Sequence, residues 1–174
     1  YQAGFAGVAT ALASQKWIAR CHRVIWVSST RVYRESGGGW VDEHSPLNLD
    51  EAQASSMIAG EVAIRRAATA TIIRPAGVYG DPEGMLMRRV RVGEGGATTA
   101  LYGNRIHRED LARLIVHCID RDVACQLVPP TVVGADDDQT PTHEIEDWLA
   151  DQIGVTLTRP VSYTHLRAHE TLTD

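Results

Sequence analysis

The chain has 174 residues, 44% of them hydrophobic and 22% charged, a composition that fits one globular domain of ordinary size. Its formal net charge of −5 argues against nucleic acid or an anionic membrane surface as a partner, and no apolar run approaches the roughly 20 residues needed to cross a bilayer. Three cysteines without a CxxC spacing predict neither a disulfide framework nor a zinc site, and they favour a reducing, cytoplasmic setting.

Helical and strand periodicities alternate along the chain. In order, they predict a helix at 1–20, a strand at 23–29, a loop at 37–46, a helix at 48–68, a strand at 71–75, a glycine-rich irregular stretch at 77–103, an extended segment at 104–106, a helix at 109–120, a strand at 127–134 and a helix at 141–153. Asn48 with Glu51 resembles a capping box, and Gly154 predicts the end of the last helix.

The predicted strands are rich in β-branched residues and do not alternate in polarity, which is typical of strands buried on both faces. Strands that alternate with helices predict a parallel sheet. We therefore expect an α/β fold, a partial Rossmann-like parallel sheet with part of a small C-terminal lobe.

Ligands of open α/β sheets bind beyond the carboxyl ends of the strands, and two segments qualify. Val27-Ser-Ser-Thr30 ends the first strand, and its hydroxyls either contact a ligand or satisfy the backbone of a turn. Arg74-Pro-Ala-Gly-Val-Tyr-Gly80 ends the second, and its small residues either admit a planar ligand or serve a loop that needs glycine. Composition alone leaves both alternatives open.

An ordered set of segments extends this pattern: Val27-Ser-Ser-Thr-Arg-Val-Tyr33, Trp40-Val-Asp-Glu43, Ala59-Gly-Glu61, Arg74-Pro-Ala-Gly-Val-Tyr-Gly80 and Asn104-Arg-Ile-His-Arg-Glu-Asp-Leu-Ala112. The set resembles the extended or atypical short-chain dehydrogenase/reductases, the NAD-dependent epimerase/dehydratase group, over about residues 1–155. The resemblance implies NAD or NADP as the cofactor and a small-molecule substrate, either polar or linked to a nucleotide. It also implies a possible homodimer through residues 1–20 and 50–68.

The resemblance assigns roles only where residues match. Ser29 corresponds to the catalytic Ser or Thr that hydrogen-bonds the reacting oxygen. Cofactor contacts are assigned to Ser28, Pro75, Ala76, Gly77 and Val78, and substrate contacts to Asn104, Arg105 and His107. No metal site is expected. The triple Asp136–Asp138 lacks the spacing of a calcium loop, and His165 with His169 lies in a segment resembling a translated sequencing adapter.

One departure from the family pattern bears on catalysis. Alignment on Ala59-Gly60-Glu61 puts Gln53 and Met57 at the positions of the family's Tyr and Lys, and neither side chain can transfer a proton. Two hypotheses follow: an oxidoreductase or epimerase-like enzyme, or a dinucleotide-binding sensor or scaffold without turnover.

The chain begins at Tyr1 inside a helical pattern, and no glycine-rich phosphate loop follows a strand. We therefore expect residues 1–160 to be the C-terminal portion of a Rossmann-type domain with its substrate lobe, and residues 161–174 to be a non-native tail.

Overall fold

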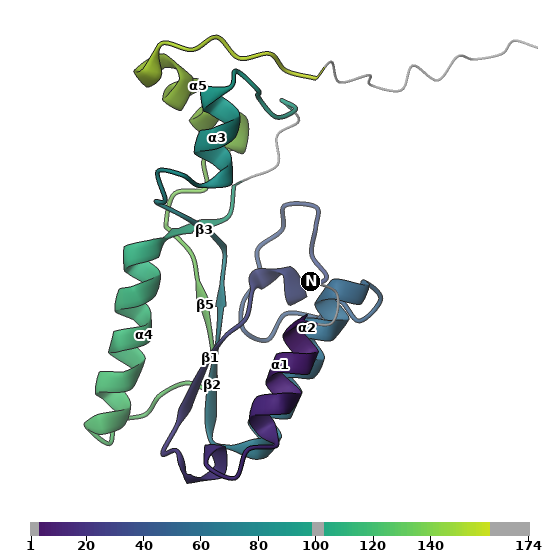
Figure 1. Cartoon of the computed structure of the whole chain (residues 1–174), viewed down its shortest axis with the longest axis vertical. Coiled ribbons are helices and arrows are strands. Elements are labelled where there is room, and N and C mark those ends of the chain that lie inside the picture. Colours follow the sequence, from purple (N-terminus) through teal and green to yellow (C-terminus); the bar gives the residue numbers. More distant parts are fainter. Residues whose placement is uncertain (1–3, 99–102, 161–174) are drawn as a thin grey trace, which may run out of the picture. The chain divides into compact units, whose positions relative to one another are not determined.

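The computed structural model describes residues 4–98 and 103–160. The chain divides into two compact units, one of residues 1–81 with 104–139 and one of residues 82–103 with 140–174 (Figure 1). The first unit holds the sheet and the second holds two helices.

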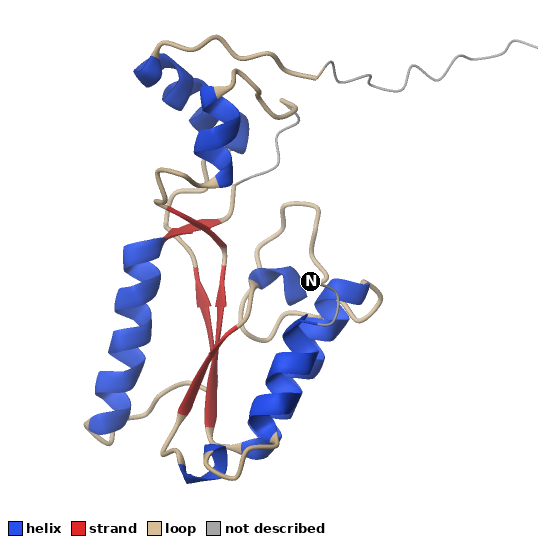
Figure 2. Cartoon of the chain, viewed as in Figure 1, coloured by secondary structure: helices blue, strands red, loops and turns tan. Residues whose placement is uncertain are grey.

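Three parallel strands form the sheet of the first unit, in the order β1 (Val24–Val27), β2 (Ala70–Pro75) and β5 (Thr131–Gly134). Val24 lies opposite Ala70, and Ile72 lies opposite Thr131. Every residue of the central strand β2 is buried, as its unbroken apolar run predicts. The parallel α/β fold expected from the sequence is therefore confirmed (Figure 2).

Helices cover both faces of this sheet (Figure 1). They are α1 (Gly4–Ala13) and α2 (Ala52–Ala67) on one face, and α4 (Arg108–Val123) on the other. Trp26 and Ile72 pack under α1 and α2 with Ile64, whereas Ile73 packs under α4 with Cys118. These two clusters form the core that holds the carboxyl ends of the strands in place.

The first two helices are shorter than the sequence predicts. Helix α1 ends at Ala13, and a separate 3-10 turn, η1 (Ile18–Arg20), precedes β1. Helix α2 is capped by Glu51, whose carboxylate accepts the N–H groups of Gln53 and Ala54 at 3.3 and 2.9 Å. Asn48 instead accepts the N–H of Glu51, so the expected cap forms a turn ahead of the helix.

Two short segments extend the sheet region. Strands β3 (Gly77–Tyr79) and β4 (Arg105–His107) pair in parallel as a second, two-stranded sheet. The strand predicted at 127–134 is confined to β5, because proline cannot donate to a ladder and Pro129 and Pro130 precede it.

A long loop joins the turn η2 (Thr30–Val32) to α2 and rises beyond the carboxyl end of β1 (Figure 1). Arg34 N donates to Pro46 O at 2.9 Å and closes the loop at its base. The Glu43 carboxylate accepts the N–H of Val133 at 2.9 Å, on the edge of β5 that faces away from β2. The loop therefore covers that edge.

The second unit contains α3 (Met85–Arg91) and α5 (Thr142–Ile153). The sequence analysis missed α3, because its seven residues are too few to establish a period and lie in a glycine-rich stretch. Gly154 ends α5 with φ of 69°, as predicted. The tail at 161–174, with His165 and His169, lies outside the described residues. In the part of the chain that is described, no helix is long and apolar enough to cross a membrane.

Candidate functional site at the carboxyl edge of the sheet

Strands β1 and β2 end side by side, and Ser28 lies at this edge. Its N–H donates to Ile73 O at 2.7 Å, and the residue is 6% exposed. The Ser28 hydroxyl is buried and has no hydrogen-bond partner among the described residues. An unpaired buried hydroxyl costs about 1–3 kcal/mol, so a ligand that supplies a partner here would recover that free energy.

Ser29 starts the turn η2, where its Oγ accepts the N–H of Arg31 at 3.2 Å. The turn-capping role that composition left open is therefore present. It does not exclude a catalytic role, because a hydroxyl that accepts one hydrogen bond still has a proton to donate. Ser29 is half-buried and can present this proton at the edge.

A buried ion pair lies beneath this edge. Arg74 Nη2 and Glu61 Oε2 are 2.7 Å apart, and Arg74 Nη1 donates to the Tyr33 hydroxyl at 3.1 Å. Burial lowers the pKa of Arg74, but Glu61 and Tyr33 outweigh that effect and the pKa is raised. Burial also raises the pKa of Tyr33, against the opposing effect of Arg74. Tyr33 therefore stays protonated near neutral pH and is a poor general base.

The two positions aligned with the family's Tyr and Lys lie on α2. Met57 is buried in a cluster with Val32 and Ile58, and Gln53 is exposed. Neither side chain brings an acid or base to the edge.

The backbone at the end of β2 is less available than the sequence suggests. Ala76 N donates to Gly134 O at 2.8 Å, Gly77 N donates to Asn104 O at 3.1 Å, and Pro75 has no N–H. Val78 alternates with Gly77 and Tyr79, so its backbone points away from β4. Of the four residues assigned to the cofactor in this segment, only Val78 is left with an N–H that can meet a ligand.

The residues assigned to the substrate lie on β4 or directly before it, beside β3. The Tyr79 and His107 rings lie edge to face, 5.1 Å apart. Asp136 accepts the N–H of His107 at 3.3 Å and hydrogen-bonds Tyr79, which, together with burial, raises the pKa of Tyr79. This cluster lies on the two-stranded sheet of β3 and β4, whereas Ser28 follows β1 of the three-stranded sheet.

The individual roles of these substrate residues differ. His107 caps α4, because its Nδ1 accepts the N–H of Glu109 at 3.4 Å. Arg105 contributes its carbonyl to Asp136 N at 2.7 Å, and Asn104 contributes its carbonyl to Gly77. Gly80 has φ of +103°, and a Cβ there would lie 2.3 Å from His107 Nε2. Sequence reasoning missed Asp136 and Gly80 in this cluster, because both act through contacts distant in sequence.

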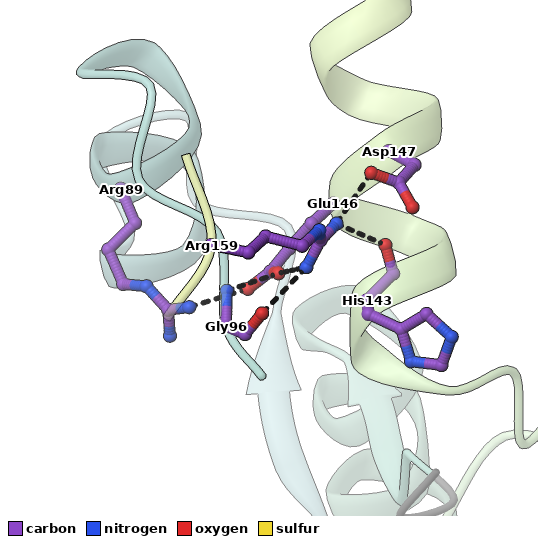
Figure 3. A network of polar contacts seen from close by, with 6 residues as sticks. All are labelled: Arg89, Gly96, His143, Glu146, Asp147 and Arg159. Atoms are coloured by element: carbon purple, nitrogen blue, oxygen red, sulfur yellow. Dashed lines mark hydrogen bonds and ion pairs between the residues drawn. The ribbon is translucent and has the colours of Figure 1, made fainter. Parts of the chain in front are cut away.

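A second polar centre lies in the second unit, around Glu146, which is completely buried (Figure 3). Arg89 Nη2 binds its Oε1 at 2.7 Å, and Arg159 Nη1 and Gly96 N bind its Oε2 at 2.9 and 2.7 Å. Arg159 also donates a hydrogen bond to Asp147, and this bond is the main reason that the pKa of Arg159 is raised. Both carboxylate oxygens of Glu146 are occupied by the protein, so this centre braces α3 and α5.

These observations define the class of protein. A parallel sheet flanked by helices, with a buried unpaired hydroxyl and small residues at its carboxyl edge, is the arrangement of a Rossmann-type nucleotide-binding fold. The chain belongs to the NAD(P)H-binding family, whose sequence profile matches residues 7–122. This membership confirms NAD or NADP as the cofactor class expected from the sequence.

Solved structures agree with the assignment. A Methylobacillus flagellatus protein assigned to the NAD-dependent epimerase/dehydratases is 25% identical, with a TM-score of 0.67, over 89% of this chain and 60% of its own length. A human epimerase family protein with NADPH is 17% identical, with a TM-score of 0.75, over 91% of this chain and 56% of its own. The UDP-glucuronic acid 4-epimerase of Bacillus cereus with NAD is 15% identical, with a TM-score of 0.69, over 90% and 54%.

The expected resemblance to the epimerase/dehydratase group is thereby confirmed at the level of family and fold. The chain spans between about half and three fifths of the length of these structures. No curated protein matches the chain.

Proposed function

We propose that the chain is part of an NAD(P)-dependent epimerase/dehydratase-like oxidoreductase whose substrate is a small polar or nucleotide-linked molecule. The observation that carries the proposal is the unpaired, buried Ser28 hydroxyl at the carboxyl edge of a parallel sheet. Its neighbour Ser29 would donate a hydrogen bond to the reacting oxygen of the substrate and polarise it, because the Ser29 Oγ is already fixed by Arg31 N.

Ser28 and the Val78 backbone suit the nicotinamide end of the cofactor better than its phosphates. A bound nicotinamide supplies hydride chemistry, while Ser28 and the Val78 backbone would orient its ring or carboxamide. Among the described residues, none of the three strands of the main sheet is followed by a glycine-rich turn into an α-helix, the arrangement that binds a pyrophosphate. The residues here therefore account for orientation at the reacting end only.

We further propose that residues 1–160 form the C-terminal portion of a larger Rossmann domain, and that the phosphates are bound by its other portion. The outer edge of β1 supports this proposal. Ile25 and Val27 alternate with the residues that bond β2, and no hydrogen bond reaches their outward N–H and C=O groups from the described part of the chain. A further parallel strand would satisfy them. We expect such a protein to be cytoplasmic and to be a homodimer.

A second candidate function is a dinucleotide-binding sensor or scaffold without turnover. The specific observation in its favour is that Met57 is buried, Gln53 is exposed, and Tyr33 is held protonated by burial. An enzyme of this kind would need another source of the proton.

The test is calorimetric titration of NAD(H) and NADP(H) against this chain and against a longer gene product that extends upstream of residue 1. Binding by the longer protein only, weakened by Ser28→Val, is the expected result. Tight dinucleotide binding by the 174-residue chain would overturn the division of the site. If the longer protein turns over substrate and Ser29→Ala abolishes this turnover, the protein is an enzyme. A sensor would show no turnover and would bind the cofactor equally well with Ser or Ala at position 29.

A further inference from the structure

The loop that leaves the carboxyl edge of β1 displays an exposed tryptophan. Trp40 is 86% exposed, the largest exposed fraction among the large hydrophobic residues described. A single exposed apolar side chain is ordinary on a protein surface. What sets Trp40 apart is how its loop is held and how it is charged.

Hydrogen bonds fix the backbone on both sides of Trp40. On one side, Glu35 Oε1 accepts the N–H groups of Gly37 and Gly39. On the other, the Asp42 carboxylate accepts the N–H of His44 at 3.0 Å and the hydroxyl of Ser45 at 2.8 Å. With Glu43 fixed on Val133, the loop presents the indole from an ordered support, which reduces the entropy lost when a ligand binds it.

The charges around Trp40 are negative. Residues 30–51 contain five carboxylates and two arginines, and both arginines are ion-paired, Arg31 with Glu51 and Arg34 with Asp50. Among the described residues, no arginine or lysine is ion-paired with Glu35, Asp42 or Glu43, and His44 is the one cationic group that acts on Asp42. The Gly37 N–H lowers the pKa of Glu35, and the Ser45 hydroxyl lowers the pKa of Asp42, so both are ionised at neutral pH.

We propose that Trp40 is the stacking residue for a planar, positively charged ring at the candidate site. An indole face attracts a cation, and the adjacent carboxylates repel phosphates and other anions. The ring belongs either to the oxidised nicotinamide of the cofactor or to the substrate. The inference names the ligand chemistry of the proposed site, and in that respect it rests on the proposed function.

The test uses the 174-residue chain and three small ring compounds of similar size: the N-methylnicotinamide cation, neutral benzamide and the benzoate anion. Tryptophan fluorescence quenching and the NMR shift of the Trp40 indole N–H report binding. We expect the cation to bind about tenfold more tightly than benzoate, with benzamide between them. Raising the salt concentration should weaken binding of the cation and leave binding of benzamide unchanged.

Matched variants assign the binding to Trp40. Trp40→Leu should lower the affinity for the cation about tenfold, and Trp40→Phe should retain most of it. Trp148→Leu, which replaces an exposed tryptophan of α5, should leave the affinity unchanged. Asp42→Asn keeps an oxygen acceptor for His44 N and Ser45 and removes the charge, so it should weaken only the cation, about twofold to threefold.

Equal binding of the cation by Trp40→Leu and the unchanged chain, or benzoate binding as tight as that of the cation, would overturn the proposal. Titrations of the upstream-extended protein separate this outcome from failure of the proposed function. Dinucleotide binding without Trp40-dependent probe binding refutes the stacking role alone. Probe binding that needs Trp40, in a protein that binds no dinucleotide, supports the stacking role and refutes the proposed function. Displacement of the probe by NAD identifies the cofactor ring as the ligand, and binding of both together identifies the substrate ring.

Discussion

Each unit of the chain buries a carboxylate against arginine, and the two centres differ in the number of groups that bind the carboxylate and in what lies at the same sheet edge. In the second unit, Glu146 receives hydrogen bonds from two arginines and a backbone N–H. In the first, both oxygens of Glu61 accept hydrogen bonds from Arg74, at 3.1 and 2.7 Å, while the buried Ser28 hydroxyl at the same sheet edge has no partner among the described residues. A buried carboxylate whose hydrogen bonds all come from the protein stabilises the fold. A buried polar group without a partner at a sheet edge instead indicates a ligand-binding position.

The largest expected effect comes from removing the carboxylate of the first centre. Glu61→Ala would leave the Arg74 guanidinium buried without a counter-charge and should lower the free energy of unfolding by about 3–5 kcal/mol. Chemical denaturation measures the loss. The control is Glu61→Leu with Arg74→Met, which removes both charges and should recover most of the stability. A loss under 1 kcal/mol for Glu61→Ala would show that water reaches Arg74 and that this centre is not closed.

Two glycines extend the contrast between the units. Gly80→Ala combines a positive φ with a contact to His107 Nε2 and should cost about 2–4 kcal/mol. Gly154→Ala also has a positive φ but open space around it, so it should cost about 1 kcal/mol. Thermal unfolding compares the two, and the His107 ring resonances should shift only in Gly80→Ala. Equal costs would mean that His107 moves aside freely.

The brace in the second unit should tolerate loss of its carboxylate better than the first centre does. Glu146→Ala leaves Arg89 and Arg159, and the Arg89 side chain is 37% exposed, so water can reach at least one of them. We expect a loss of about 1–3 kcal/mol. Residue-resolved hydrogen exchange should show it as faster exchange in α3 and α5, with the sheet strands unchanged. Faster exchange in β2 would contradict the separation of the two centres.

The smallest change in stability is expected at Ser28. Ser28→Ala removes an unpaired buried hydroxyl and should leave the free energy of unfolding within about 1 kcal/mol of the original value, with the balance toward stabilisation. Denaturation midpoints measure it. A loss of 2 kcal/mol or more would mean that the hydroxyl already has a partner in solution, and the main support for the ligand site would disappear.

The sequence predicts the sheet better than it predicts either centre. The apolar run at Ala70–Pro75 marks a strand that is buried at every residue, because burial on both faces leaves an unbroken pattern in neighbouring residues. The run at Val24–Val27 also marks a strand, but its burial on both faces was wrong for the described residues, since its first three residues are half-buried and Val27 is exposed. Ser28 and Ser29 could be assigned because they directly follow such a run. Contacts between residues distant in sequence leave no such pattern, as the pairing of Glu43 with Val133 illustrates.

The polar centres depend on such distant contacts. Arg74 and Glu61 are 13 positions apart, and Arg89 and Glu146 are 57 apart. No periodicity links them, so neither ion pair was expected. Helix α3 was missed for a different reason, since its seven residues include three arginines and it has no side-chain cap at its start.

The hydrogen bond between Glu43 and Val133 joins residues 90 positions apart. A ribosome adding about 5–20 residues per second needs on the order of 5–20 s to cover that interval. Throughout it, the Trp40 loop lacks its contact with β5, and its apolar tip is open to chaperones and proteases. We expect proteases to cut the loop in nascent chains stalled before β5 is made and to spare it in chains released after β5; cleavage at equal rates in both would refute this order of events.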